Sequence, residues 1–156
     1  MSKTTFELVQ EYKKRNKGGI TWNRLHKHSA IIDKYKHADE EVIYAFAGQK
    51  SEKKLSEFFY TCVVALTDRR LLVAQKRVVF GYRLLSITPD LYNDLTVYSG
   101  LIWGKIIIDT VKEKVYITNL AKKSLKEIQV SISEYMMKAK QKYRVRSEGY
   151  TPDLHI

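Results

Sequence analysis

The spacing of hydrophobic residues divides the chain into a helical beginning, a strand-like middle and a helical end. Phe6, Val9 and Tyr12 share one face of a first helix, predicted over residues 5–16. Thr4 lies three residues before Glu7, the spacing of a capping box at a helix start. A glycine pair after the helix predicts its end.

A second helix is predicted to begin near Thr21, with a narrow apolar stripe and a basic far side. The stripe consists of Trp22, Leu25, Ser29, Ile32 and Tyr35. A stripe this narrow favours a helix that packs on the rest of the protein while its cations face water. The alternative is that Arg24, Lys27 and Lys34 hold the helix on an anionic membrane surface.

After His37 the period becomes that of β-strands. Seven strands are predicted, at residues 41–49, 58–66, 71–75, 78–87, 95–98, 101–109 and 115–120. Short polar turns separate them and no helical crossover intervenes, so the sheet is predicted to be antiparallel throughout.

A last helix is predicted over residues 122–144. Its apolar face consists of Leu125, Ile128, Ile132, Tyr135, Met136 and Ala139. We therefore expect an N-terminal helical extension at residues 1–38, a mainly β domain at 39–143 and a flexible tail at 144–156.

Several stretches of this β region resemble a known family. They are the hairpin segment Val64 to Leu72, Ser86 to Leu91, Trp103 to Ile108, and Asn119-Leu120 before the last helix. In this order they resemble bacterial pleckstrin-homology (PH) domains of the YokE-like kind, which are related in fold to GRAM domains. The resemblance covers residues 39–143. It implies a mainly β (α+β) fold, a seven-stranded antiparallel split barrel capped by the C-terminal helix, here preceded by a helical hairpin.

The resemblance also implies where an anion would bind. Eukaryotic members of this fold often bind phosphoinositides through basic residues of the first inter-strand loop, which corresponds to Lys50 to Lys54. Together with neighbouring turns, this gives the candidate residues Lys50, Lys53, Lys54, Arg69, Arg70, Lys76 and Arg77.

The distribution of charge shifts attention towards the helices. The net charge is +11. Residues 1–38 carry nine Lys or Arg and three Asp or Glu, and residues 122–156 carry eight and four, whereas residues 39–121 carry eleven and ten. Because the β region is nearly neutral, the helices on either side of it are the better candidates for contacts with acidic partners.

No combination of residues predicts catalysis, a cofactor or a metal. Cys62 lies within an apolar strand and is predicted to be a buried structural thiol. His26 and His28 are two residues apart on a helix and so face different directions, which favours solvated histidines over metal ligands. A lone cysteine and the absence of a signal-peptide pattern predict a cytoplasmic protein, at most peripheral to a membrane.

The leading interpretation is a non-catalytic binding module whose partner is another protein or a second copy of the chain. The open strand edges of the expected fold favour this interpretation. Peripheral attachment to an anionic membrane through basic helices and loops is the second interpretation. Nucleic-acid binding is the third and is not favoured, because the sheet that would read bases is nearly neutral.

Overall fold

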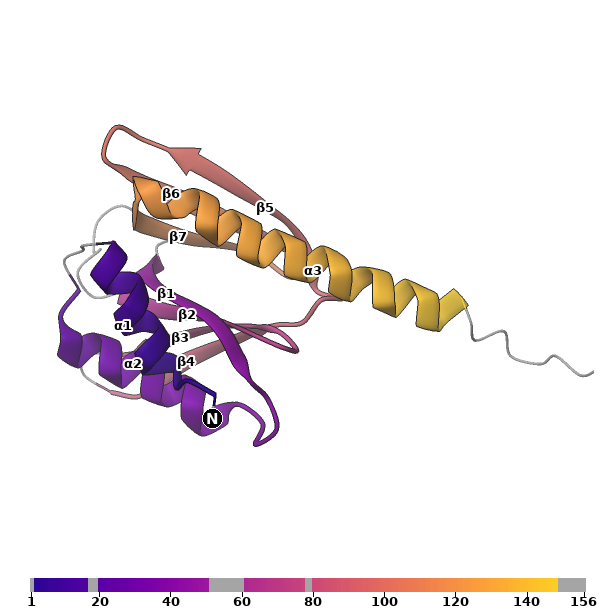
Figure 1. Ribbon diagram of the computed structural model, residues 1–156, viewed down its shortest axis with the longest axis horizontal. Coiled ribbons are helices and arrows are strands. Elements are labelled where there is room, and N and C mark those ends of the chain that lie inside the picture. The colour runs from indigo at the N-terminus through magenta and orange to yellow at the C-terminus, as the bar shows by residue number, and fades with distance from the viewer. Residues whose placement is uncertain (1, 17–19, 51–60, 78–79, 149–156) are drawn as a thin grey trace, which may run out of the picture.

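Three helices and one sheet make up the protein in a computed structural model that describes residues 2–16, 20–50, 61–77 and 80–148 (Figure 1). The helices are α1 (Thr5–Arg15), α2 (Trp22–Tyr35) and α3 (Leu125–Glu148), the last preceded by a 3₁₀ turn, Lys122–Ser124. The strands are β1 (Val42–Lys50), β2 (Thr61–Thr67), β3 (Leu71–Lys76), β4 (Tyr82–Ile87), β5 (Tyr92–Ser99), β6 (Trp103–Thr110) and β7 (Lys114–Ala121).

All seven strands join one antiparallel sheet in the order β4-β3-β2-β1-β7-β6-β5. The sheet curls, and α3 lies across its inner side (Figure 1). Strand β7 contains a bulge, where Asn119 adopts a φ of 54° and the pairing with β6 shifts register. Such bulges bend a strand and help a sheet to curl. The predicted fold class, an open antiparallel barrel with a C-terminal helix and two N-terminal helices, is confirmed.

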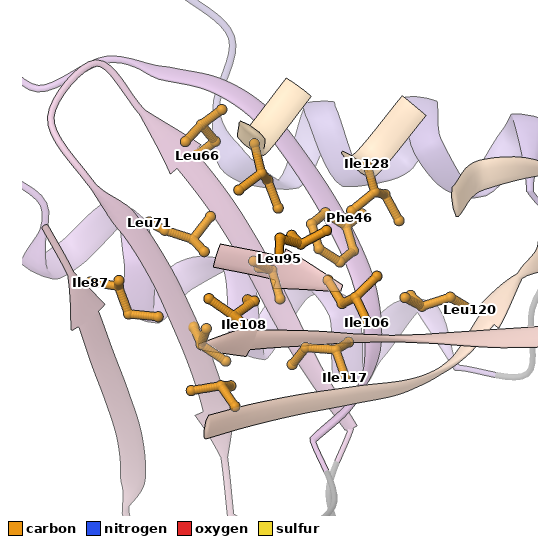
Figure 2. Packing of buried hydrophobic residues seen from close by; sticks show 14 of the residues in the cluster. Phe46, Leu66, Leu71, Ile87, Leu95, Ile106, Ile108, Ile117, Leu120 and Ile128 are labelled. Carbon is orange, nitrogen blue, oxygen red and sulfur yellow. The ribbon is translucent and has the colours of Figure 1, made fainter. Parts of the chain in front are cut away.

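The inner core lies between the concave side of the sheet and α3. Leu125, Ile128, Ile132 and Met136 are buried there, as their spacing predicted. Figure 2 shows how side chains from β1, β2, β3, β6 and β7 converge on this helix. The apolar face of α3 therefore fills the open side of the curled sheet.

A second core lies on the outer side of the sheet, beneath α1 and α2. In β2, Cys62, Val64 and Leu66 face the inner core, whereas Val63 and Ala65 face the outer one. Both faces of β2 are therefore buried, which explains why its apolar run is unbroken. In an antiparallel sheet with one solvent-exposed face, apolar and polar residues would alternate instead. Leu25 and Ile32 of α2 are fully buried in the outer core, so α2 packs on the sheet as the narrow stripe predicted.

The His28 side chain links α2 to the sheet through hydrogen bonds. The prediction that this side chain is solvated is wrong. The side chain is fully buried. Its Nδ1 accepts a hydrogen bond of 2.7 Å from the Lys76 backbone N–H, so Nε2 carries the proton and lies 2.9 Å from the Thr61 hydroxyl. Burial, aided by the positive charge of Arg24, lowers the pKa of His28 to about 3. His28 is therefore a neutral structural link.

Several element boundaries differ from the prediction. Strand β4 begins at Tyr82, whereas it was predicted from residue 78, and β5 begins at Tyr92, whereas it was predicted from Leu95. Strand β6 begins at Trp103, whereas the strand was predicted from Leu101. Helix α3 continues past Arg144 to Glu148, and residues 149–156 of the predicted tail lie outside the described residues.

Candidate functional site

Five predicted site residues lie on or near α2 and the end of β3. The Arg24 guanidinium donates a hydrogen bond to the Lys76 carbonyl, which places the two residues together. The exposed Arg77 follows β3, and its N–H donates to the Gly81 carbonyl at 3.0 Å. Lys27 and Lys34 are exposed on the outer side of α2.

Arg69 and Arg70 lie in the β2–β3 turn, at the other end of β3, and both are paired. Arg69 forms an exposed ion pair with Asp39. Arg70 holds the buried Glu40 carboxylate through two hydrogen bonds of 2.9 Å. Burial alone would raise the pKa of Glu40, but hydrogen bonds from Arg70 and Thr67 hold that pKa at about 2. These contacts fasten the turn to the start of β1.

The three loop candidates complete the set. Lys50 is buried at the end of β1, opposite Ile117 of β7. Lys53 and Lys54 lie outside the described residues. The predicted site residues therefore do not form one patch: one group lies at the α2–β3 corner, another at the β2–β3 turn, and Lys50 is in the sheet.

A groove of about 680 Å³ adjoins the β2–β3 turn, between the ends of the strands and the C-terminal half of α3. It is lined by His37, Asp68, Arg69, Arg70, Thr88, Pro89, Tyr135, Lys138, Ala139 and Lys142. Lys138 and Lys142 are exposed, and neither forms an ion pair with a described residue. The groove combines a partly apolar wall with these two free cations.

Among the described residues, unpaired cations also gather beside exposed apolar side chains at the N-terminal end of α3. There a hollow of about 460 Å³ is lined by Lys14, Arg15, Ile102, Trp103, Ala121, Lys122 and Lys123. We call Lys14, Arg15, Lys122 and Lys123 the basic collar. Figure 1 shows the start of α3 beside the β5–β6 connection, far from the end of α3 that borders the groove.

Contacts between α1 and α3 bring the basic collar together. The Tyr12 hydroxyl lies 2.9 Å from the Ser124 hydroxyl in a buried hydrogen bond, and Arg15 forms an exposed ion pair of 2.7 Å with Glu127. These contacts place Lys14 beside the Lys122-Lys123 turn, although the segments are more than a hundred residues apart in sequence. Lys14, Lys122 and Lys123 are exposed, and none forms an ion pair with a described residue.

The stability of α3 does not explain its two leading lysines. The N-terminal end of a helix carries a partial positive charge, so cations there are destabilising and anions are favoured. Lys122 and Lys123 occupy the 3₁₀ turn immediately before α3. Their position adds to the positive potential of the helix end, an arrangement suited to a negatively charged surface.

This site is not apparent from the sequence. Lys14, Lys122 and Trp103 were not among the candidates, because their meeting depends on how α1 packs against α3. One local signal was available. Leu101 and Ile102 directly follow Ser99-Gly100, a turn sequence, although both were assigned to the strand that follows.

The described residues offer little for other chemistry. Within them, no three His, Cys, Asp or Glu side chains are placed to hold a metal ion. Cys62 is fully buried, as predicted, and burial raises the pKa of its thiol to about 12. No helix in the described part of the chain is long and apolar enough to cross a bilayer.

Comparison with known proteins identifies the family. A family model described as a bacterial PH domain matches residues 37–134. The chain belongs to the bacterial PH domain family. The predicted resemblance is therefore confirmed, and bacterial PH domains are typically non-catalytic modules.

Among solved structures, this PH domain is similar to a DUF1696 family protein with a pleckstrin-homology domain from Shewanella loihica PV-4. The two share 13% sequence identity and a TM-score of 0.45, over 73% of this chain and 91% of the other. No curated protein matches the chain.

Proposed function

We propose that this PH domain is a non-catalytic binding module that attaches to the cytoplasmic surface of an anionic bilayer through its basic collar. The observation that carries the proposal is the hollow in which cations from α1 and from the start of α3 surround exposed Ile102 and Trp103. An anionic bilayer offers negative headgroups above an apolar interior, so it complements both parts of this surface.

The expected strength follows from the number of cations. A Lys or Arg near an anionic membrane surface contributes about 1 kcal/mol. Neutralising both lysines in K122Q/K123Q should therefore cost about 2 kcal/mol, or roughly a 30-fold weaker partition onto vesicles.

Vesicle flotation tests this proposal. Wild-type protein should float with vesicles of phosphatidylcholine and phosphatidylglycerol, and should not float with phosphatidylcholine alone. The matched control is K138Q/K142Q, which removes the same charge about 26 Å away along α3. This control should float like the wild type. Equal recovery with neutral vesicles, or equal losses in both variants, would contradict attachment through the basic collar.

A protein partner, the leading interpretation of the sequence, remains a second candidate because of the groove beside the C-terminal half of α3. Lys138 and Lys142 line this groove opposite the β2–β3 turn, so it suits an acidic segment with an apolar residue. In addition, β4 and β5 are the edge strands of the sheet in the described part of the chain.

Site-specific photo-crosslinking in cells tests this second function. A photoreactive residue at Lys142 should capture a defined partner that is absent when the same group replaces the exposed Lys112. Capture should weaken in the K138Q background. Identical products from both positions, or none from Lys142, would count against a partner in the groove.

A further inference from the structure

The β5–β6 hairpin ends in three consecutive bulky apolar side chains that face solvent. Leu101 is 97% exposed, Ile102 is 71% exposed and Trp103 is 46% exposed. Single exposed apolar residues are common on protein surfaces, but a contiguous cluster of this kind marks a surface that is covered in function.

Folding does not require these residue types at the tip. The Gly100 N–H donates to the Trp103 carbonyl at 3.0 Å, so Leu101 and Ile102 occupy the connection between these residues. Such positions usually hold Gly, Asn, Asp or Ser, whose small or polar side chains suit a turn. A polar pair would close this hairpin equally well, which leaves the apolar side chains without a structural role.

The tip is held in a fixed position beside the basic collar. Strand pairing continues to the end of the hairpin, where Ser99 lies opposite Gly104. A Cβ atom at Gly104 would lie 2.4 Å from the Leu125 side chain, so the glycine lets β6 pack closely on the start of α3. Ile102 and Trp103 consequently line the same hollow as Lys122.

We infer that this hairpin enters the bilayer: Leu101 and Ile102 reach the boundary between headgroups and acyl chains, and Trp103 lies at the headgroup level. The inference rests on the proposed attachment of the basic collar. Tryptophan is enriched at membrane–water interfaces because its ring is large and apolar while its N–H remains polar. Interfacial segments of this kind bury their apolar side chains about 5–10 Å below the headgroups.

Charge favours a bilayer over a second copy of the chain as the occupant. Four cations line the hollow at the tip, of which only Arg15 is paired, with Glu127; none of the described residues that line it is acidic. A symmetric contact would place two such collars against each other, and like charges would repel. An anionic bilayer instead neutralises the collar and covers the tip in a single contact.

Two properties separate insertion from purely electrostatic attachment. Salt screens the contribution of the collar but leaves burial of apolar side chains largely intact. The chain contains two tryptophans, so a Trp22→Phe background leaves Trp103 as the only indole. Its fluorescence then reports directly on the environment of the hairpin.

The experiment titrates W22F protein with vesicles of phosphatidylcholine and phosphatidylglycerol at low and high salt. We expect Trp103 emission to shift to shorter wavelength and to be quenched by lipids brominated near the top of the acyl chain. Adding L101S/I102S should lower the partition coefficient at high salt roughly 30-fold. The matched control V111S/M137S replaces two other exposed apolar residues and should retain the wild-type value.

The outcomes distinguish insertion from the proposed attachment. Salt-sensitive binding with no shift in Trp103 emission, and with L101S/I102S equal to wild type, would overturn insertion while attachment stands. No binding to anionic vesicles at either salt would overturn both. A dimer detected by light scattering and abolished by L101S/I102S would show that a second copy covers the tip, and would also overturn the inference. An unchanged urea midpoint for L101S/I102S confirms that the variant is folded.

Discussion

Acidification should weaken the folded protein through His28, the buried imidazole that joins α2 to β2 and β3. Its pKa is about 3 in the folded state, whereas an unperturbed histidine has a pKa of about 6.5. Between these values the unfolded state holds one more proton than the folded state. Stability therefore falls by about 1.4 kcal/mol per pH unit as the pH drops from 6.5 towards 3.

The size of the effect can be worked out for an accessible pH. Between pH 7.5 and pH 5 the loss from His28 comes to about 2 kcal/mol. Because pH 5 lies well above the folded pKa, this figure depends mainly on the pKa of the unfolded histidine. Protonation of Glu40 also destabilises the folded protein on acidification, since the pKa of Glu40 is lowered to about 2 in the folded state. That loss begins only near the ordinary pKa of glutamate, so pH 5 largely separates the two effects.

Urea unfolding of wild type and H28Q at both pH values measures this contribution. Glutamine removes the titrating group and keeps a side chain that can form hydrogen bonds. Acidification from pH 7.5 to pH 5 should lower the free energy of unfolding of the wild type by about 2 kcal/mol more than that of H28Q. Equal losses in the two proteins would refute the assignment of His28 as a buried neutral link.

Three further predictions concern the packing that positions the candidate surfaces. Glu40→Gln should lower the free energy of unfolding, measured in urea, by about 3 kcal/mol, because it leaves the half-buried Arg70 charge unpaired. The double variant E40Q/R70M should recover most of this stability, and a double variant as unstable as E40Q would contradict the pairing. Gly104→Ala should lower the free energy of unfolding by roughly 1–3 kcal/mol, because the new methyl group clashes with the Leu125 side chain. The same substitution should destabilise an L125A protein less, and equal destabilisation in both backgrounds would argue against the clash. The Cys62 thiol should react with iodoacetamide only as urea unfolds the protein, so rapid native labelling would contradict its burial.

The sequence was sufficient to predict the architecture because burial imposes a period on each element. Ile128, Ile132 and Met136 repeat at helical spacing and lie in the inner core. The unbroken apolar run of β2 indicated a buried strand, and its two-sided burial follows once α1 and α2 cover the outer face. Elements with one strong period were therefore found within a few residues of their ends.

The candidate surfaces depend on contacts that leave no local pattern. Lys14 lies near Lys122 where α1 packs against the turn before α3, a contact that includes the hydrogen bond between Tyr12 and Ser124. Glu40 pairs with Arg70 where the β2–β3 turn lies against the start of β1. From composition alone, Arg70 and the lysines of the basic collar cannot be told apart from the other cations of the chain. Only their placement separates Arg70, which is held by Glu40, from the lysines of the basic collar.

The hairpin tip was missed for a different reason. Leu101 and Ile102 are strong strand formers, so the pattern extended β6 through them. Hydrophobic periodicity identifies residues that avoid water, but it does not distinguish burial in the protein from exposure in a turn. The preceding Ser99-Gly100 was the signal that these residues belong to the connection.

Hydrogen exchange measured by mass spectrometry with anionic vesicles tests most directly whether the protein meets the bilayer through the basic collar. We expect vesicles of phosphatidylcholine and phosphatidylglycerol to slow exchange in peptides covering Gly100 to Trp103 and the turn Lys122–Ser124. Peptides covering the groove around Lys138 should exchange as they do without vesicles. Protection confined to the groove, or no difference from neutral vesicles, would contradict attachment through the basic collar.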